Sequence, residues 1–586
     1  MVAPNKVAAH RSWWKEQSVY QIYPASFKDT NGDGVGDIPG IISELDYLKN
    51  LGVDIVWLSP ILESPQVDMG YDISNYYDIH PPYGTMQDVE TMIKGLHDRG
   101  MKYVMDLVVN HTSNQHHWFQ ESRKSLDNPY RDFYIWKKPR YDENGNPHPP
   151  NNWKSHFSGP AWQLDPLTNE YYLCLFAPQQ CDLNWENPKV REEVHKIMRF
   201  WLDKGVDGFR MDVINFISKR PGLPDARDPP LHPSSFLGAE HYANGPRVHE
   251  YLQGIGKIMK EYDAFSVGEM PFVYDEQEVL MSVGATRGEL NMIFQFDIVE
   301  SDHGNGGKFT DGHWTLTKFK KIVNRWQTFM CENGGWNALF LENHDQGRSI
   351  SRFASDKPEF RTLSAKMLAT FLALQCGTPF VYQGQELAQI RLDDNWGIEK
   401  FQDIEIVNYW KELTEKHGDD KKRLNDVLRE MRLKSRDGGR TPMQWNDKPN
   451  AGFTTPNTKP WISLHDDYKE WNAANAVADP NSAYHHWGKV LNLRKEFVNI
   501  FVYGMFAMYD EASEEVFAYT RDYDENNRGL VVCSFKDYEI SWTIPEALLD
   551  LVSKGKVVLN NYPEDTIKDG KIILKPFQAL VIVQTA

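Results

Sequence analysis

The sequence predicts an α/β protein centred on a (β/α)8 TIM barrel, with a small domain inserted after strand 3 and a C-terminal antiparallel β-sandwich. Two observations predict the barrel: eight short β-rich apolar runs lie between residue 19 and residue 382, and amphipathic stretches alternate with them. Such alternation is typical of parallel strands joined by helices, and eight units of this kind close into a barrel. A third observation predicts the sandwich, because after residue 503 the chain changes to short alternating segments separated by turn residues.

The eight predicted strands are short and rich in β-branched and aromatic residues. They cover residues 19–23, 54–58, 103–109, 208–211, 265–268, 292–296, 338–341 and 379–382. Helices are predicted between them where apolar residues recur with a helical period, among them 41–51, 89–98, 190–204 and 364–374. A helix over 484–496 closes the barrel.

Two connections are too long for simple loops. Residues 110–176 are rich in Asn, Pro, Gly and Trp without a strong helical period, so we expect a small inserted domain at the C-terminal face of the barrel. A second excursion, over about 387–482, follows the eighth strand. The predicted domains are the barrel (domain A, 1–109 and 177–503), the inserted domain B (110–176) and the C-terminal β-sandwich (domain C, 504–586).

Composition and charge argue against nucleic acid and membranes as partners. The formal net charge is −18, whereas nucleic acids and anionic membranes attract basic surfaces. The five cysteines are scattered without a Cys-x-x-Cys or Cys/His pattern, which favours a reduced protein over a disulfide framework. No apolar segment is long enough to span a bilayer, and the single glycosylation sequon falls at 110–112. We therefore expect a cytoplasmic location and a small-molecule partner.

Polar residues at the ends of four predicted strands converge on the mouth of the barrel, where barrel enzymes keep their active sites. The motifs NHT, GFRMD, VGE and ENHD follow or end strands three, four, five and seven. The residues that they bring together are Asp212, Glu269, Asp345, His111, Arg210 and His344. A single Asp at a strand end is more often a helix cap or an ion-pair partner. Three crowded like charges, however, destabilise a fold and are kept mainly where function needs them.

Glycoside cleavage is the chemistry that needs such a group. A retaining glycosidase uses one ionised carboxylate to attack the anomeric carbon and a second, protonated one to release the leaving oxygen. Arg210 lies two residues before Asp212, on the same face of the strand, and can keep that carboxylate ionised. Glu269 must be protonated when substrate binds, and the neighbouring carboxylates favour that state.

Six motifs along the chain resemble the signature regions of glycoside hydrolase family 13, the α-amylase family. They are QSVYQIYPASFKDTNGDGVGD, GVDIVWLSP, DLVVNHTS, GFRMDVINFISK, FLENHDQGR and RTPMQW. Within the family they resemble the oligo-1,6-glucosidase and yeast/fungal maltase–isomaltase subgroup. The resemblance covers essentially the whole chain and implies that Asp212 is the nucleophile, Glu269 the acid/base and Asp345 a third carboxylate that holds sugar hydroxyls and distorts the ring.

The same resemblance implies the substrate-binding residues of a retaining exo-acting enzyme. His111, Arg210 and His344 would bind the glucose in the −1 subsite. Asp68 and Arg440 would hold its far hydroxyls and close the pocket, which leaves no room for a further sugar. The remaining implied contacts are a stacking platform, Tyr71, and a pocket wall of Phe157, Phe176 and Gln180.

The segment DTNGDGVGD, residues 29–37, carries oxygen ligands at alternate positions and resembles the first nine positions of an EF-hand loop. Its twelfth position is Gly40 rather than Glu, which argues against a regulatory EF-hand. The alternative is an Asp/Gly-rich turn. The family resemblance implies a structural Ca²⁺ and no organic cofactor, with these metal ligands: Asp29, Asn31, Asp33, Asp37 and the carbonyl of Val35.

The residue after the proposed nucleophile, Val213, bears on linkage. In the resembled enzymes a valine at this position accompanies cleavage of α-1,6 links, whereas threonine or alanine accompanies cleavage of maltose. Met270, after Glu269, is also expected to face the +1 sugar. We therefore predict an α-glucosidase that releases α-glucose from isomaltose-type α-1,6 links, with transglucosylation. The alternative is a broad α-1,4/α-1,3 enzyme acting on maltose, nigerose and sucrose.

Two other readings of the family are disfavoured. Transporter-associated members without activity have a membrane anchor and lack the triad, whereas this chain keeps the triad and shows no anchor. Sucrose isomerases carry an arginine-rich loop near the end of the sixth strand, where this chain has FDIVESDHG. Hydrolysis is therefore preferred.

Overall fold

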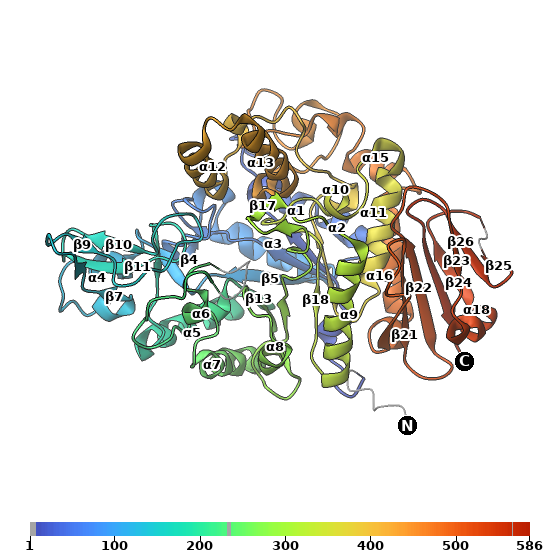
Figure 1. Ribbon diagram of the computed structural model, residues 1–586, viewed down its shortest axis with the longest axis horizontal. Helices are drawn as coiled ribbons and strands as arrows, with labels where there is room; N and C mark the ends of the chain where they lie inside the picture. Colours follow the sequence, from blue (N-terminus) through green and yellow to red (C-terminus); the bar gives the residue numbers. More distant parts are fainter. Residues whose placement is uncertain (1–7, 231–235, 565–566) are drawn as a thin grey trace.

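The computed structural model describes residues 8–230, 236–564 and 567–586. At its centre lies an eight-stranded parallel sheet in the order β15-β14-β13-β5-β2-β1-β19-β18. A parallel bridge between Ile293 of β15 and Asn337, directly before β18, joins the two edge strands. The sheet therefore closes into a barrel, and the predicted (β/α)8 architecture is confirmed (Figure 1).

Each barrel strand overlaps one of the eight predicted runs. The strands are β1 (Val19–Ile22), β2 (Ile55–Leu58), β5 (Lys102–Leu107), β13 (Gly208–Met211), β14 (Phe265–Glu269), β15 (Met292–Phe294), β18 (Ala338–Leu339) and β19 (Thr378–Tyr382). The third ends at Leu107, before the predicted Val109, so the motif NHT does not end a barrel strand. His111 and Thr112 of this motif lie instead in a separate strand, β6 (His111–Ser113), which pairs with β12 (Gln180–Asp182) outside the barrel.

Amphipathic helices surround the barrel. They include α1 (Ile38–Ser43), α2 (Leu45–Leu51), α3 (Met86–Asp98), α5 (Pro188–Asp203), α7 (Val248–Glu261), α9 (Leu316–Asn333), α11 (Pro358–Ala373) and α16 (Ala483–Glu496). Helix α3 shows why these segments are helical. Thr85 and Asp88 form a capping box at its start, and its buried residues recur at helical spacing on the barrel side.

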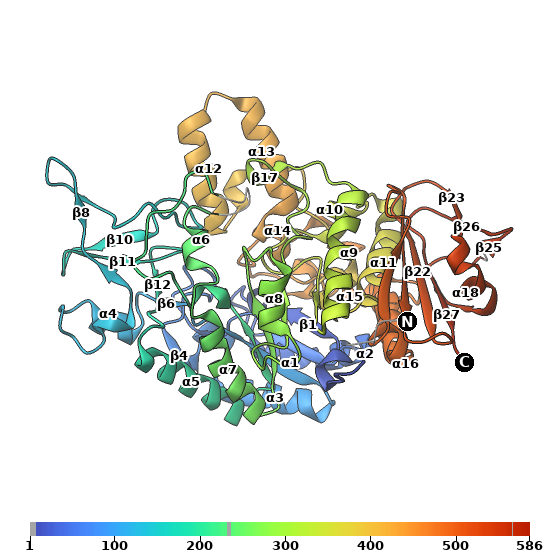
Figure 2. The ribbon, with the colours of Figure 1, turned by 60° about the horizontal axis from the view of Figure 1, so that its bottom comes forward.

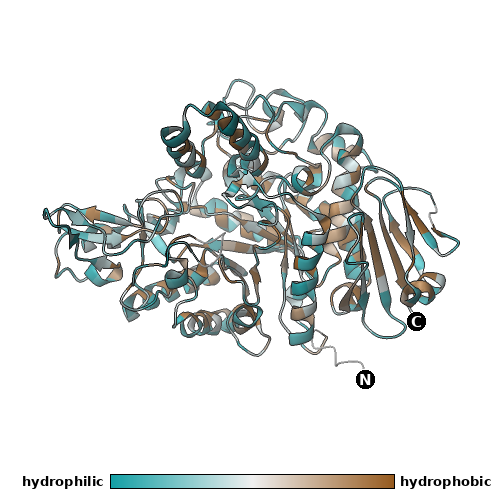
Figure 3. Ribbon diagram, in the orientation of Figure 1, coloured by the Kyte–Doolittle hydropathy of each residue, from teal (hydrophilic) through white to brown (hydrophobic). Residues whose placement is uncertain are grey.

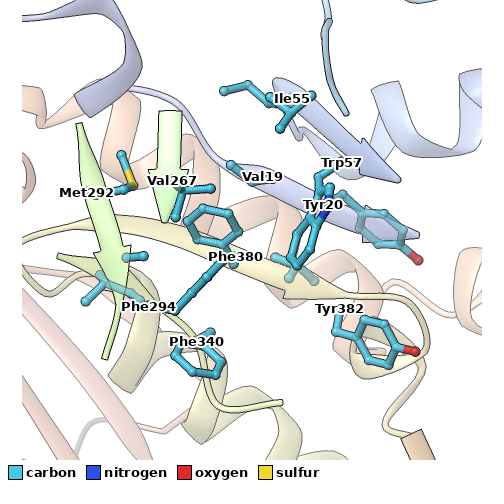
Figure 4. Close-up of a cluster of buried hydrophobic side chains, with 14 of the residues drawn as sticks. Val19, Tyr20, Ile55, Trp57, Val267, Met292, Phe294, Phe340, Phe380 and Tyr382 are labelled. Carbon is cyan, nitrogen blue, oxygen red and sulfur yellow. The ribbon is translucent and has the colours of Figure 1, made fainter. Parts of the chain in front are cut away.

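Large apolar side chains fill the barrel interior, as Figure 4 shows for Trp57, Phe294 and Phe380. The rings of Trp57 and Phe294 stack with centroids 5.6 Å apart, and Phe380 meets Trp57 edge-on at 6.3 Å. The barrel is therefore a packed core rather than a channel, and its rigid strands fix the positions of the side chains at its mouth.

The inserted segment after β5 projects to one side of the barrel (Figure 1). It contains α4 (His117–Ser122), a short hairpin of β8 (Arg140–Tyr141) and β9 (Pro147–His148), and an antiparallel sheet of β7 (Trp136–Lys137), β11 (Glu170–Leu173) and β10 (Trp162–Asp165). The β6–β12 pair lies where the inserted segment joins the barrel. The predicted inserted domain after the third strand is therefore present.

The excursion after β19 carries a helical hairpin, α12 (Ile404–His417) and α13 (Lys421–Lys434), which rises above the barrel in Figure 2. Both helices are largely hydrophilic in Figure 3. A short helix, α14 (Arg436–Arg440), follows directly and is buried. Its Gly439 packs so closely on the loop after β18 that a Cβ atom there would lie 2.8 Å from the carbonyl oxygens of Asn343 and Gln346.

The C-terminal part is a β-sandwich, as predicted. One antiparallel sheet has the order β20 (Met505–Tyr509), β21 (Val516–Asp522), β22 (Arg528–Ser534), β27 (Ala579–Gln584) and β24 (Lys556–Asn560), and the other has β23 (Ile540–Thr543), β26 (Lys571–Leu574) and β25 (Ile567–Lys568). Apolar side chains of both sheets form one core between them. The residue bounds assigned to the three domains stay predictions.

All five cysteines lie in the described part of the chain, where they are buried and form no disulfide. None of the helices within residues 8–230, 236–564 and 567–586 has the length and apolar character needed to cross a bilayer. The cytoplasmic location stays a prediction.

Candidate active site

Asp212 and Glu269 are held together by one arginine at the mouth of the barrel. Arg210 of β13 donates through Nη1 to Asp212 Oδ1 at 2.9 Å and through Nη2 to Glu269 Oε2 at 2.5 Å. The same Nη1 donates to Asp106 Oδ1 of β5 at 2.9 Å. Arg210 thus contacts Asp212, as expected, and also Glu269 and Asp106, since β5, β13 and β14 are neighbours in the sheet.

The pKa values of Asp212 and Glu269 are both raised by burial. For Glu269 burial raises the pKa to about 8, against the opposing effect of Arg210 and with a further increase from the charge of Asp212. For Asp212 burial raises the pKa to about 7, again against Arg210. Glu269 has the higher pKa of the two and therefore keeps its proton to higher pH.

Asp345 differs from both because it is surrounded by cations. Burial alone would raise its pKa, but the guanidinium groups of Arg436 and Arg440 hold that pKa well below its usual range. Arg436 Nε and Arg440 Nη2 each lie 3.0 Å from Asp345 Oδ1. The site therefore combines one carboxylate whose pKa is strongly lowered, Asp345, with two carboxyl groups whose pKa values are raised, a separation typical of acid–base catalysis.

The far end of the site contains a buried ion pair between Asp68 and Arg436. Asp68, which is 5% exposed, is bound by Arg436 Nη2 at 2.8 Å and by Gln180 Nε2 at 3.0 Å. Burial raises the pKa of Asp68 to about 6. Arg440, which was expected to close the pocket together with Asp68, donates instead to Asp345 Oδ1, to Asp403 Oδ2 and to the carbonyl of His344. That Asp68 and Arg440 hold the far hydroxyls of the glucose stays a prediction.

Helix α14 explains why Arg436, rather than Arg440, bonds Asp68. Arg436 and Arg440 are four residues apart, so they lie on one face of the helix, and Arg436 is one turn nearer to Asp68. Sequence reasoning missed Arg436 and Asp403, as well as Asp106 beneath Arg210. The signal for Arg436 was present in the segment RDGGR, whose spacing puts two arginines on one face immediately before the recognised motif TPMQW.

Two buried histidines connect the two ends of the site. His344 Nε2 lies 2.6 Å from the hydroxyl of Tyr71, and His344 Nδ1 lies 2.8 Å from Gln21 Nε2. His111 Nε2 lies 3.0 Å from the Tyr71 carbonyl oxygen and 3.2 Å from Gln180 Nε2. Burial lowers the pKa of both histidines, which favours neutral rings. Tyr71, expected as a stacking platform, thus also joins the histidines by hydrogen bonds.

The predicted wall residues lie beside these groups. The guanidinium of Arg436 is 5.4 Å from the ring centroid of Phe157. Phe176 stacks on His156 at 4.6 Å and meets His111 at 5.2 Å. The described structure therefore brings the predicted aromatic residues to the charged group.

Val213 adopts a conformation that is rare for a β-branched residue, with φ +33° and ψ +44°. This turn directs its backbone N–H to Glu269 Oε2, at 3.2 Å. Met270 is 2% exposed and belongs to the main apolar core, unlike the polar residues of the site. The expectation that Met270 faces a +1 sugar stays a prediction.

Solvent reaches this group at the carboxyl side chains. The exposed fraction of the side chain is 29% for Asp345, 12% for Glu269 and 10% for Asp212, against 2% for Arg210 and 0% for His344. A substrate from solution therefore meets the three carboxyl groups first.

The Asp/Gly loop over 29–37 lies against residues 453–459 rather than in this group. Asp29 accepts from the amides of Gly32 and Gly34 at 2.7 and 2.8 Å, and Asp37 accepts from the amide of Thr30 at 2.8 Å. Its donors are all oxygens, as Ca²⁺ prefers. Among the residues that the structure describes, however, no three acidic, histidine or cysteine side chains gather closely enough to hold a metal ion, so the fit rests on donor chemistry alone.

Comparisons with known proteins agree with this geometry. The family model described as "Alpha amylase, catalytic domain" matches residues 21–504. An α-glucosidase of Schizosaccharomyces pombe is 50% identical over 575 residues, which cover 97% of this chain and 98% of that protein. An oligo-1,6-glucosidase of Parageobacillus thermoglucosidasius is 49% identical, with 97% and 99% covered. The crystal structure of Bacillus licheniformis trehalose-6-phosphate hydrolase superposes with a TM-score of 0.90 at 42% identity, covering 98% of this chain and 100% of that one. With the barrel, the carboxyl groups at its mouth and these matches in agreement, the chain belongs to the α-amylase family of glycoside hydrolases.

Proposed function

We propose that the protein is an exo-acting, retaining α-glucosidase that releases α-glucose from the non-reducing end of short α-glucosides. One observation carries the proposal: a single guanidinium, that of Arg210, bonds both Asp212 Oδ1 and Glu269 Oε2. An inverting enzyme separates its two carboxyl groups by roughly 6.5–9.5 Å to admit a water molecule, whereas a retaining enzyme places them about 5–5.5 Å apart. Two carboxyl groups bonded by one guanidinium lie close together, which supports retention.

In the proposed reaction Asp212 attacks the anomeric carbon while Glu269 gives its proton to the departing glycosidic oxygen. A glucosyl ester on Asp212 results. Glu269, now ionised, takes a proton from water, which attacks the same carbon and regenerates Asp212. Two displacements at one carbon retain its configuration, so the product is α-glucose. A sugar hydroxyl that replaces water in the second step gives transglucosylation.

The glucose that is cleaved would lie between the catalytic pair and Asp68. We assign its outer hydroxyls to Asp68 and Arg436, with His111 and His344 beside them and Asp345 held ionised by Arg440. This buried charged end supports exo action, because a further sugar beyond it would have to displace the Asp68–Arg436 pair.

For linkage we propose α-1,6 cleavage of the isomaltose type, on the strength of Val213 and of relatives named oligo-1,6-glucosidase. The second candidate is a broad maltase-type enzyme, supported by the relative named α-glucosidase. Initial rates on isomaltose, maltose, nigerose and sucrose separate the two. Proton NMR of the first product tests the mechanism, because β-glucose would contradict retention and a failure to cleave isomaltose would contradict the linkage.

We also propose that the loop over 29–37 holds a structural Ca²⁺ through the oxygens of Asp29, Asn31, Asp33, Val35 and Asp37. Bound there, the ion would tie the loop to residues 453–459 without taking part in the reaction. A chelator should therefore lower the melting temperature, and Asp33→Asn should reduce that response. An unchanged melting temperature in the chelator, with no calcium retained by the purified protein, would contradict the proposal.

A further inference from the structure

The two arginines of the site stand side by side with little room between them. Arg436 Nε and Arg440 Nη2 both contact the same oxygen, Asp345 Oδ1, at 3.0 Å. Both arginine side chains are buried, so water screens their mutual repulsion only weakly. Asp345 offers one oxygen to both guanidinium groups, and Asp68 bonds Arg436 but not Arg440, so a further carboxylate that reaches both arginines would stabilise this arrangement.

Asp403 supplies that charge from a distant part of the chain. Its Oδ2 lies 3.0 Å from Arg440 Nη1 and 3.3 Å from Arg436 Nε, and the residue is 4% exposed. Its other oxygen, Oδ1, accepts from the amide of Glu405 at 3.0 Å and so caps helix α12. The carboxylate is thereby fixed between a helix N-terminus and the two arginines.

We propose that Asp403 is a positioning residue for catalysis: it clamps Arg436 and Arg440 together and, through them, sets the places of Asp68 and Asp345. It touches neither carboxylate directly. Its action passes through Arg436 to Asp68 at 2.8 Å and through both arginines to Asp345. This inference rests on the proposed function, because it assigns a role within that reaction.

The backbone around Asp403 is held in a way that fits this role. The amides of Gln402 and Asp403 donate to Asp437 Oδ1 at 2.7 and 3.3 Å. Asp437 lies in α14 between the two arginines. The segment that carries Asp403 is therefore hydrogen-bonded to the helix that carries Arg436 and Arg440. The segment after β19 therefore supplies both the two arginines of the site and the carboxylate that holds them.

The test compares charge with helix capping. Asp403→Asn removes the charge but keeps a good N-cap, whereas Asp403→Glu keeps the charge but is a poorer cap. Asp420→Asn is the matched control: Asp420 caps α13, a helix of the same 14-residue length as α12, and it is exposed. For each variant we would measure kcat and KM on para-nitrophenyl α-glucoside, together with the melting temperature.

We expect Asp403→Asn to lower kcat/KM on the order of 10- to 100-fold, as misplaced binding groups do, with both a higher KM and a lower kcat. Asp403→Glu should be more active than Asp403→Asn although it is no more stable, and Asp420→Asn should match the wild type. Activity that follows stability, with Asn equal to or better than Glu, would overturn the proposal. If Asp403→Asn does not fold, Asp403→Ser, another uncharged N-cap, replaces it, and wild-type activity in that variant would also overturn the clamp. A wild-type protein that cleaves no α-glucoside would instead contradict the proposed function itself.

Discussion

Replacing Arg436 by Met tests whether the buried charges at the far end of the site are balanced as the structure indicates. The side chains of Arg436 and Asp68 are 8% and 6% exposed. Methionine keeps much of the apolar stem but removes the guanidinium, so Asp68 is left buried with only Gln180 as a donor. Breaking a buried pair in this way costs about 3–5 kcal/mol of unfolding free energy. That is a large part of the roughly 5–15 kcal/mol that stabilises a typical domain.

The size of the loss should depend on pH, and its sign follows from the pKa of Asp68. Burial raises that pKa to about 6 and Arg436 lowers it, so removing Arg436 raises it further. A carboxyl group whose pKa is raised on folding stabilises the fold below its unfolded pKa, and this stabilisation is lost as pH rises through the folded pKa. The cost of keeping Asp68 buried without Arg436 is therefore larger at pH 8 than at pH 5, where its carboxyl group is protonated.

Urea unfolding at these two pH values measures the effect. Arg140→Met is the matched control, because Arg140 pairs with Asp225 on the surface, with side chains 55% and 51% exposed. Such a pair contributes about 0–1 kcal/mol. We expect the Arg436→Met loss to be several times that of the control at pH 8 and to shrink at pH 5. A loss no larger than the control, or one that is the same at both pH values, would refute the reasoning.

Three further predictions concern the reaction. Asp212→Asn should lower kcat by at least about 10³-fold, as loss of a nucleophile does, while circular dichroism stays unchanged, because the amide oxygen still accepts from Arg210; appreciable residual turnover would exclude Asp212 as the nucleophile. The wild-type kcat/KM should fall as pH rises through about 8, where Glu269 loses its proton, and a rate independent of pH up to 10 would contradict Glu269 as the acid. Val213→Thr keeps the β-branch and replaces one methyl group by a hydroxyl, so it should lower the ratio of isomaltose to maltose hydrolysis without changing the melting temperature by more than a few degrees; an unchanged ratio would remove the linkage argument.

The barrel and its three carboxyl groups could be predicted from the sequence because both depend on local patterns. Apolar runs mark the strands, and Asp212 and Glu269 stand at strand ends, which face the barrel mouth. Asp345 lies in the loop after β18 rather than at the end of that strand. The prediction failed where position depends on a loop. His111 lies on β6 rather than at a strand end, since pairing with β12 determines its place.

The arginine that bonds Asp68 could not be predicted for a related reason. Periodicity shows that Arg436 and Arg440 share a face of α14, but not which of them reaches Asp68, because that depends on how the whole excursion packs on the barrel. The close approach of Gly439 to Asn343 fixes this packing, and it becomes apparent only in three dimensions. The left-handed turn at Val213 was also beyond prediction, because a β-branched residue seldom adopts it.

The ion pair between Asp68 and Arg436 joins residues 368 positions apart, and this separation constrains the order in which the protein can mature. On the ribosome Asp68 emerges early, whereas Arg436 is made only after all eight barrel strands. Until then the nascent barrel contains Asp68, Asp212, Glu269 and Asp345 without the cation that balances its far end. A segment translated late in the catalytic domain therefore completes the charge balance of the site.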